Sequence, residues 1–209
     1  MYLFSRRRRI DPGHVTKAVE WSVEATVKAR EITGTGIEAW MAVMSPEVGT
    51  VVWTIWAESL AELEAAGDAL AGDAKFNKWA EEADDWFDGP MEDRIASMIH
   101  GALDPDEPQA NYVTVVEAVA ANGRLKEAIG SAIVIAEHAT RVGGQNTGLL
   151  LNLTGAYGGL AWITGSPDIA TIDAGEAALN ADPTWLDVVS GVGADYAPGA
   201  TSTIYRRLA

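Results

Sequence analysis

Hydrophobic and polar positions near the start of the chain predict a strand followed by an amphipathic helix. Residues 2–10 have the length and composition of a strand, and Asp11-Pro12-Gly13 marks a turn into a helix from about His14 to Thr33. Small and apolar residues then recur at the spacing of one helix face, at Val15, Ala18, Val19, Ser22, Val23 and Thr26. We therefore expect one side of this helix to face a sheet.

The next elements read as a hairpin, a second helix and a last strand. The apolar runs Trp40 to Met44 and Thr50 to Trp56 flank a turn that contains Gly49, which is typical of a β-hairpin. A helical segment follows, and the strand from Arg94 to His100 comes after Gly89-Pro90. The first half of the chain is thus predicted to be β-α-β-β-α-β, the order of a ferredoxin-like unit.

The same order of elements recurs about 110 residues later. A strand at 112–120, a helix at 124–142, a hairpin, a second helix and a strand at 203–208 are predicted. The glycines of the first half have counterparts 110 positions on, in the pairs Gly13 and Gly123, Gly34 and Gly144, and Gly49 and Gly159. Leu70 to Asp73 and Leu179 to Asp182 are 109 apart, so one residue has been lost in between.

These patterns predict an α+β chain of two tandem ferredoxin-like βαββαβ repeats. The first repeat is expected at 1–103 and the second at 112–209, joined by a linker at 104–111 that is polar and rich in proline. The hairpin runs Trp40 to Met44 and Leu149 to Leu153 are apolar at consecutive positions, so both faces of these strands must be covered. Helices cover one face, and we expect the sheet of the other repeat to cover the second.

A local motif adds a resemblance to a known superfamily. Leu179-Asn180-Ala181-Asp182-Pro183-Thr184-Trp185 resembles an L-x-A-D-P-x-W pattern found in the second helix of dimeric α/β barrel proteins, whereas the segment 70–76 lacks the proline. The chain is similar to a fused, two-repeat member of that superfamily, an intramolecular pseudo-dimeric α/β barrel. The resemblance implies functions ranging from cofactor-independent monooxygenases and cyclases to haem enzymes and binding proteins, and fold does not choose among these.

Charge and hydropathy exclude several classes of partner. A net charge of −15 would repel nucleic acid, which is bound through clustered lysine and arginine. The longest apolar runs are far shorter than the ~20 residues of a membrane-spanning helix. The N-terminus lacks the order of regions that marks a secretion signal, so the expected location is the cytoplasm. Assembly into homo-oligomers stays open.

No metal or cofactor is expected. The chain has no cysteine, and its three histidines, His14, His100 and His138, do not have the spacing of metal ligands. Haem-using members of the superfamily usually carry a histidine on or beside the second helix, and segments 60–88 and 169–196 have none. His14 and His138 are interpreted as structural residues of helix ends. His100 ends a strand and is a candidate catalytic residue at a pocket mouth.

Arginines on predicted strands leave two interpretations open. In the run Arg6 to Arg9, alternation sends Arg6 and Arg8 to one face of the strand. They either pair with the protein's surplus carboxylates or hold an anionic group of a ligand. Arg207, next to the candidate catalytic residue Tyr205, has the same two interpretations.

Polar and aromatic residues of the hairpins are the other candidates for a site. Asn152 interrupts an apolar run, so its amide needs either a ligand or a neighbouring loop as partner. Aromatic side chains that would line a pocket, if they are not simply core residues, are Trp40, Trp53, Tyr157 and Trp162.

Two function hypotheses follow. The first is a cofactor-independent monooxygenase, cyclase or lyase that acts on a small apolar, aromatic or polyketide-like molecule. The second is a non-catalytic ligand-binding or assembly protein in which the two repeats form a scaffold. Since two copies in one chain are free to diverge, only one repeat need keep a pocket.

Overall fold

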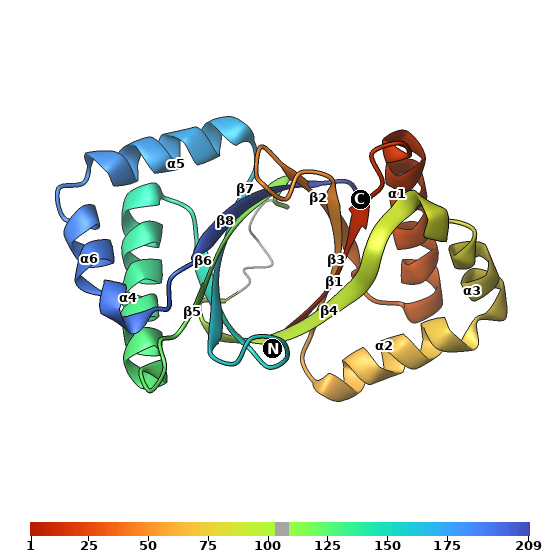
Figure 1. The fold of residues 1–209 in the computed structure, drawn as a ribbon, viewed down its shortest axis with the longest axis horizontal. Coiled ribbons are helices and arrows are strands. Elements are labelled where there is room, and N and C mark those ends of the chain that lie inside the picture. Colours follow the sequence, from red (N-terminus) through yellow and green to blue (C-terminus); the bar gives the residue numbers. More distant parts are fainter. Residues whose placement is uncertain (103–108) are drawn as a thin grey trace. The chain divides into compact units, whose positions relative to one another are not determined.

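The computed structural model describes residues 1–102 and 109–209, and its elements occur in an order that repeats once (Figure 1). The first round consists of β1 (Tyr2–Ile10), α1 (Val15–Thr33), β2 (Glu38–Val43), β3 (Thr50–Ala57), α2 (Leu60–Gly72), α3 (Ala74–Glu81), a 3-10 turn (Asp84–Trp86) and β4 (Phe87–His100). The second consists of β5 (Tyr112–Val119), α4 (Leu125–Gly143), β6 (Thr147–Asn152), β7 (Gly159–Ser166), α5 (Ile169–Ala181), α6 (Trp185–Gly191), a 3-10 turn (Gly193–Asp195) and β8 (Thr201–Arg207). The predicted α+β fold class is confirmed.

The first helix of each round ends where the sequence predicts. Gly34 and Gly144 adopt left-handed backbone angles, with φ of 68° and 75°. Their N–H groups donate to the carbonyls of Arg30 and Thr140, which satisfies carbonyls that the helix leaves unpaired. Glycine is the residue that adopts this conformation without steric cost.

The predicted second helix is divided in two in both rounds, at Asp73 and Asp182. Each aspartate has an extended backbone, and its carboxylate accepts hydrogen bonds from residues at the start of the next helical segment. The last strand also differs from the prediction, because β4 starts at Phe87, seven residues before Arg94. Asp88, Glu92 and Asp93, which precede the predicted strand, therefore belong to it.

The described chain divides into two compact units, Met1–Ile95 with Arg206–Ala209, and Ala96–Tyr205. Strands of the first unit follow the order β4-β1-β3-β2-β8, and those of the second β8-β5-β7-β6-β4. Both contain the ferredoxin-like order in which the first strand of a repeat lies between the third and the fourth. The predicted linker lies mostly outside the described residues, and the boundary there stays a prediction.

The strand register shows where the second repeat is one residue shorter than the first. Arg9 of β1 pairs with Thr50 of β3, and Val119 of β5 pairs with Gly159 of β7. The first strands are thus offset by 110 positions and the third strands by 109, so the loss lies in the turn before β3 and β7. Equivalent positions in the two repeats are 110 apart before this turn and 109 apart after it.

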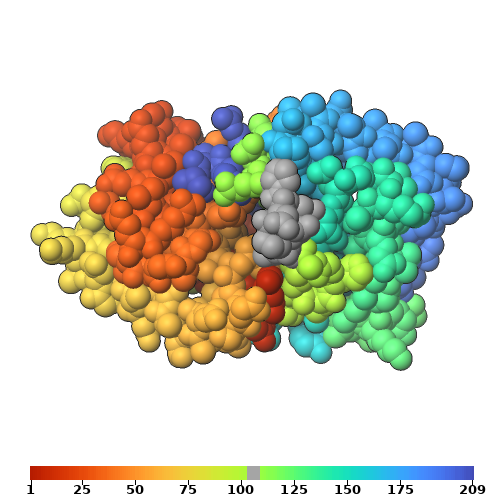
Figure 2. All heavy atoms as spheres, turned by 180° about the vertical axis from the view of Figure 1, so that it is seen from behind, coloured from red at the N-terminus to blue at the C-terminus, as the bar shows by residue number. Residues whose placement is uncertain are grey.

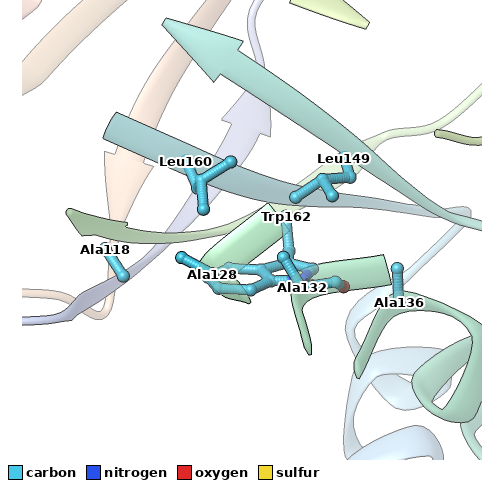
Figure 3. Close-up of a cluster of buried hydrophobic side chains, with 7 residues drawn as sticks. All are labelled: Ala118, Ala128, Ala132, Ala136, Leu149, Leu160 and Trp162. Carbon is cyan, nitrogen blue, oxygen red and sulfur yellow. Dashed lines mark hydrogen bonds between the residues drawn. The ribbon is translucent and has the colours of Figure 1, made fainter. Parts of the chain in front are cut away.

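In each unit the helices cover one face of the sheet (Figure 1). The core of the second unit is built on α4, whose buried face is made of alanines (Figure 3). The indole of Trp162 lies along these alanines, beside Ala128 and Ala132, and its Nε1 donates to the carbonyl of Ala132 at 2.9 Å. Small side chains on the helix thus make room for one large ring on the sheet.

Candidate ligand cavity

A cavity of about 510 Å³ lies in the second unit, between the sheet and its helices. Its floor is the helix-facing side of β5, β6 and β7, and its walls come from α4, α5 and α6 and from the segment that leads into β8. Figure 2 shows the outer surface of α5 (blue) beside α4 (green to teal). The volume is within the range of small-molecule sites, roughly 300–1,000 Å³.

One end of the cavity is apolar and aromatic. Val116 and Trp162 form the floor there, and Leu179 and Trp185 belong to the wall. Tyr196 also lines the cavity, with its ring at an edge-to-face angle of 64° to Trp162 and a centroid distance of 5.8 Å. Rings at these positions offer flat apolar surface to a ligand.

The other end of the floor carries a row of threonines across three strands. Thr114 of β5 pairs with Thr164 of β7, which pairs with Thr147 of β6. The hydroxyls of Thr147 and Thr164 are 2.9 Å apart, and the almost fully buried Ser166 lies one step further along β7. All four residues line the cavity, which is therefore amphipathic along its length.

Tyr196 is anchored to α4 through its hydroxyl. The hydroxyl lies 3.0 Å from the carbonyl oxygen of Ala128, to which it donates, and 2.9 Å from the hydroxyl of Ser131. Burial raises the pKa of Tyr196, so the phenol is protonated at neutral pH. The residue is thus a fixed, neutral hydrogen-bonding group in the cavity wall.

An ion pair continues this network toward the protein surface. The Arg124 guanidinium donates twice to Asp195, with Nε and Nη2 at 3.1 and 2.5 Å from the same carboxylate oxygen. This hydrogen bonding lowers the pKa of Asp195, and a hydrogen bond from Ser131 adds to the effect, while burial opposes it. Ser131 thereby connects a cavity-lining phenol to a carboxylate that stays ionised.

The motif that carries the family resemblance forms one wall of the cavity. Asp182 accepts from the N–H and hydroxyl of Thr184 with one oxygen, and the other lies 2.9 Å from Nε2 of the buried His138. Thr184, mainly through its N–H, and then His138 lower the pKa of Asp182. The His138 ring packs on Trp185 at 5.6 Å. The motif therefore fixes Trp185 against the cavity through α4.

Two side chains hold the His138 ring in place. Nη2 of Arg141 lies 2.8 Å from Nδ1, and a guanidinium can only donate, so Nδ1 is the acceptor. The ring proton is then on Nε2, where it is donated to Asp182. His138 is structural, as the sequence indicated, but through a hydrogen-bonded position rather than through a charge at a helix end.

The equivalent region of the first unit is a packed core. Positions that match the threonine row are Phe4, Ile55 and Ile37, and they pack with apolar residues of α2 and with Phe76. Trp21 occupies the position of Ser131 and stacks on Trp79 at 5.2 Å. Side chains that are rings in the first unit and smaller in the second thus account for the cavity in the second.

Most predicted site residues of the first unit are engaged in contacts of their own. Arg6 forms a two-point ion pair with Asp93, with both contacts at 2.7 Å, and Arg8 pairs with Asp84 at 2.9 Å. Arg207 pairs with Glu38 and lies over the Trp40 ring. The indole of Trp40 donates to Thr54. Trp53 packs against Trp21 and Phe87. The arginine run is thus supplied with carboxylates, the first of its two interpretations.

Of the candidates in the second unit, Trp162 lines the cavity. The Asn152 amide lies against Gly159, at a place that a Cβ would fill, and Tyr157 is 89% exposed in the turn before β7. His100 lies in β4 with Nε2 4.0 Å from Glu137, and Tyr205 lies in β8. A ligand role for these residues stays a prediction, and the structure does not bring them together with Trp162.

Sequence reasoning missed the threonine row, Trp185 and Tyr196 as cavity residues. The signal was present in the repeat itself: aligned at the right offset, Phe4 becomes Thr114 and Trp21 becomes Ser131. Within the described residues, no group of three or more histidine, aspartate or glutamate side chains is placed to hold a metal ion. No helix among those described has the length and apolar character to cross a membrane.

Whole-chain comparisons give the fold. No protein-family model and no curated protein matches the chain. A candidate monooxygenase from Fusobacterium nucleatum is similar in structure, with a TM-score of 0.70 and 9% identity over 100% of this chain and 92% of that one. An anthrone oxidase-like protein has a TM-score of 0.67 and 15% identity, over 99% of this chain and 90% of that one. A major regulator of staphylococcal pathogenesis has a TM-score of 0.56 and 9% identity, over 99% of this chain and 98% of that one.

These identities are low, so the similarities concern architecture. They extend over both repeats, as do the strand order and the two rounds of elements. The predicted superfamily resemblance is confirmed at this level. The chain has the dimeric α/β barrel fold, with two ferredoxin-like repeats in one polypeptide.

Proposed function

We propose that the second unit is the site of a small-molecule enzyme that needs no cofactor, an oxygenase of aromatic or polyketide-like substrates. The observation that carries this proposal is the divergence of the repeats. The same positions form a packed core in the first unit and an amphipathic 510 Å³ cavity in the second. A pocket of this size that leaves apolar side chains uncovered is typical of a small-molecule site.

The chemistry would use dioxygen as the oxidant. In the reaction considered, a benzylic methylene between two rings is converted to a carbonyl: anthrone and O₂ give anthraquinone and water. One oxygen atom enters the carbon and the other leaves as water, so the four electrons taken up by O₂ come from the substrate. Support for this class comes from proteins of similar structure that are described as a monooxygenase and as anthrone oxidase-like.

Tyr196 is the proposed catalytic group. It lines the cavity, and its protonated hydroxyl is linked through Ser131 to the ionised Asp195. A substrate that loses a proton to form its carbanion develops negative charge on its carbonyl oxygen. The neutral phenol of Tyr196 can donate a hydrogen bond to that oxygen in place of its bond to Ala128, while the proton leaves to solvent. Asn152, His100 and Tyr205 stay alternative candidates from the sequence.

Oxygen uptake with anthrone at neutral pH tests the proposal. We expect the protein to accelerate O₂ consumption and the appearance of anthraquinone above the spontaneous rate. The control is Ser131→Trp, which places beside the cavity residue Tyr196 the side chain that the first repeat has at this position, while Ser131→Ala adds no bulk there. A rate equal to the spontaneous one, for wild type and both variants, would contradict the enzyme.

The alternative is a non-catalytic ligand-binding or assembly protein. One observation favours it: the same fold is found in a regulator of staphylococcal pathogenesis, so the architecture is not confined to enzymes. Binding of aromatic molecules that is lost in Ser131→Trp, without any turnover, would support this alternative.

A further inference from the structure

The threonine row of the cavity differs in side-chain chemistry from the equivalent positions of the first repeat. In the first unit the row is Phe4, Ile55 and Ile37, three apolar side chains of a packed core. In the second it is Thr114, Thr164 and Thr147, three hydroxyl-bearing side chains on the floor of the cavity. Loss of side-chain volume alone would have been met by valine or alanine, so the hydroxyls need their own explanation.

Hydroxyls in an apolar interior are costly unless they are hydrogen-bonded. Leaving one without a partner costs about 1–3 kcal/mol. The hydroxyls of Thr147 and Thr164 satisfy one another at 2.9 Å, but the pair has two protons and this contact uses one. The second proton can be donated to an acceptor in the cavity. The row is therefore suited to a ligand group that accepts a hydrogen bond.

Charge narrows the class of ligand. The cavity-lining residues within the described chain include one carboxylate, Glu176, and no arginine, lysine or histidine. A carboxylate or phosphate in this place would have no cation to offset its loss of hydration, and it would meet the field of a chain with a net charge of −15. Anionic ligands are disfavoured on both counts.

We propose, on the basis of the function proposed above, that the ligand is an uncharged aromatic molecule with a carbonyl or hydroxyl group at one end. That group lies against the row formed by Thr114, Thr164 and Thr147. The ring system lies over Trp162, whose indole lies beside Ala128 and Ala132 in Figure 3, and reaches toward Trp185. The two ends of the cavity thus orient the molecule in one direction.

Equilibrium dialysis with three probes of one size tests this inference: 2-naphthol, 2-methylnaphthalene and 2-naphthoate. For wild type we expect naphthol to bind at least tenfold more tightly than the anionic naphthoate. The ratio of naphthol to methylnaphthalene affinity should fall about five- to tenfold in Thr164→Val and in Thr114→Val, the size of one lost hydrogen bond. It should be retained in Thr164→Ser, which keeps the hydroxyl.

The outcomes separate this inference from the proposed function. Naphthoate binding as tightly as naphthol, or an unchanged ratio in both valine variants, would overturn the inference and leave the aromatic-binding cavity intact. If none of the three probes bound to wild type, the proposed function would fall, and this inference with it. Circular dichroism and unfolding midpoints of the variants establish that each is folded before its affinities are compared.

Discussion

Trp162 and Trp53 occupy equivalent positions in the two repeats, yet only the indole N–H of Trp162 has an identified partner among the described residues. It donates to the carbonyl of Ala132 at 2.9 Å, whereas Nε1 of Trp53 is buried without a hydrogen bond. Trp53 contacts the rings of Trp21 and Phe87, and Trp21 stands where the second unit has the small Ser131. The same residue thus serves a closed core in one repeat and a cavity floor in the other.

This difference predicts unequal effects of the same substitution. Trp162→Phe removes the hydrogen bond to the Ala132 carbonyl and should cost about 1 kcal/mol more than Trp53→Phe, which removes a buried donor that has none. Urea unfolding of both variants measures the two free energies. Equal losses, or a larger loss for Trp53→Phe, would contradict the hydrogen-bond assignment.

Tyr196 and Phe87 occupy equivalent positions in the two repeats, and substitutions at them should change the free energy of unfolding for different reasons. Tyr196→Phe removes the hydrogen bond to Ala128 and should lower the free energy of unfolding by about 1 kcal/mol. The reverse change, Phe87→Tyr, places a hydroxyl next to Trp21, the first-repeat counterpart of Ser131. It should lower the free energy of unfolding by about 1–3 kcal/mol, because the new hydroxyl is buried without a partner. Thermal unfolding of both variants decides, and a stabilising Phe87→Tyr would show that the two environments are alike.

The fold could be predicted because its signals are local and occur twice. Gly34 and Gly144 end helices for a reason of backbone conformation, and the apolar spacing after His14 is a property of a single helix. The division of the second helix at Asp182 was not predicted, although the motif Asp182-Pro183 was noticed. The other oxygen of this carboxylate meets a buried histidine 44 residues earlier, a contact that no local pattern reveals.

The candidate site was only partly predictable, because it depends on which side chains meet across elements. Trp162 was chosen for its aromatic ring on a hairpin strand, and it does line the cavity. Tyr196 and Trp185 lie beyond α5 in the sequence and reach the cavity only through packing on α4. Arg6 and Arg8 attracted attention as charges on a central strand, but their carboxylate partners are 87 and 76 residues away.

The contact between His138 and Asp182 predicts a selective loss in Asp182→Asn. The amide keeps an oxygen for Thr184, but its NH₂ would face the N–H of His138, so two donors oppose each other. The midpoint of urea unfolding should fall. Asp73→Asn is the matched control, because Asp73 caps α3 with one oxygen. A fall as large in the control would mean that the turn, rather than the histidine, is what the variant disturbs.

The ion pair of Arg124 with Asp195 predicts a dependence of stability on pH. The pKa of Asp195 is lower in the folded protein than that of an unfolded aspartate, about 3.9, so the carboxylate stabilises the fold above that pH. The contribution is lost as the pH falls through the lowered pKa, where the folded state also takes up the proton. Asp195→Asn should therefore be less stable than wild type at pH 7, with a difference that shrinks in acid. Urea unfolding of both proteins between about pH 7 and pH 2 measures that difference, and Asp187→Asn, at an exposed carboxylate of α6, is the control. A difference that stayed constant across this range would mean that Asp195 supports the fold through shape alone, and that its charge has no part in holding Ser131 and Tyr196 at the cavity.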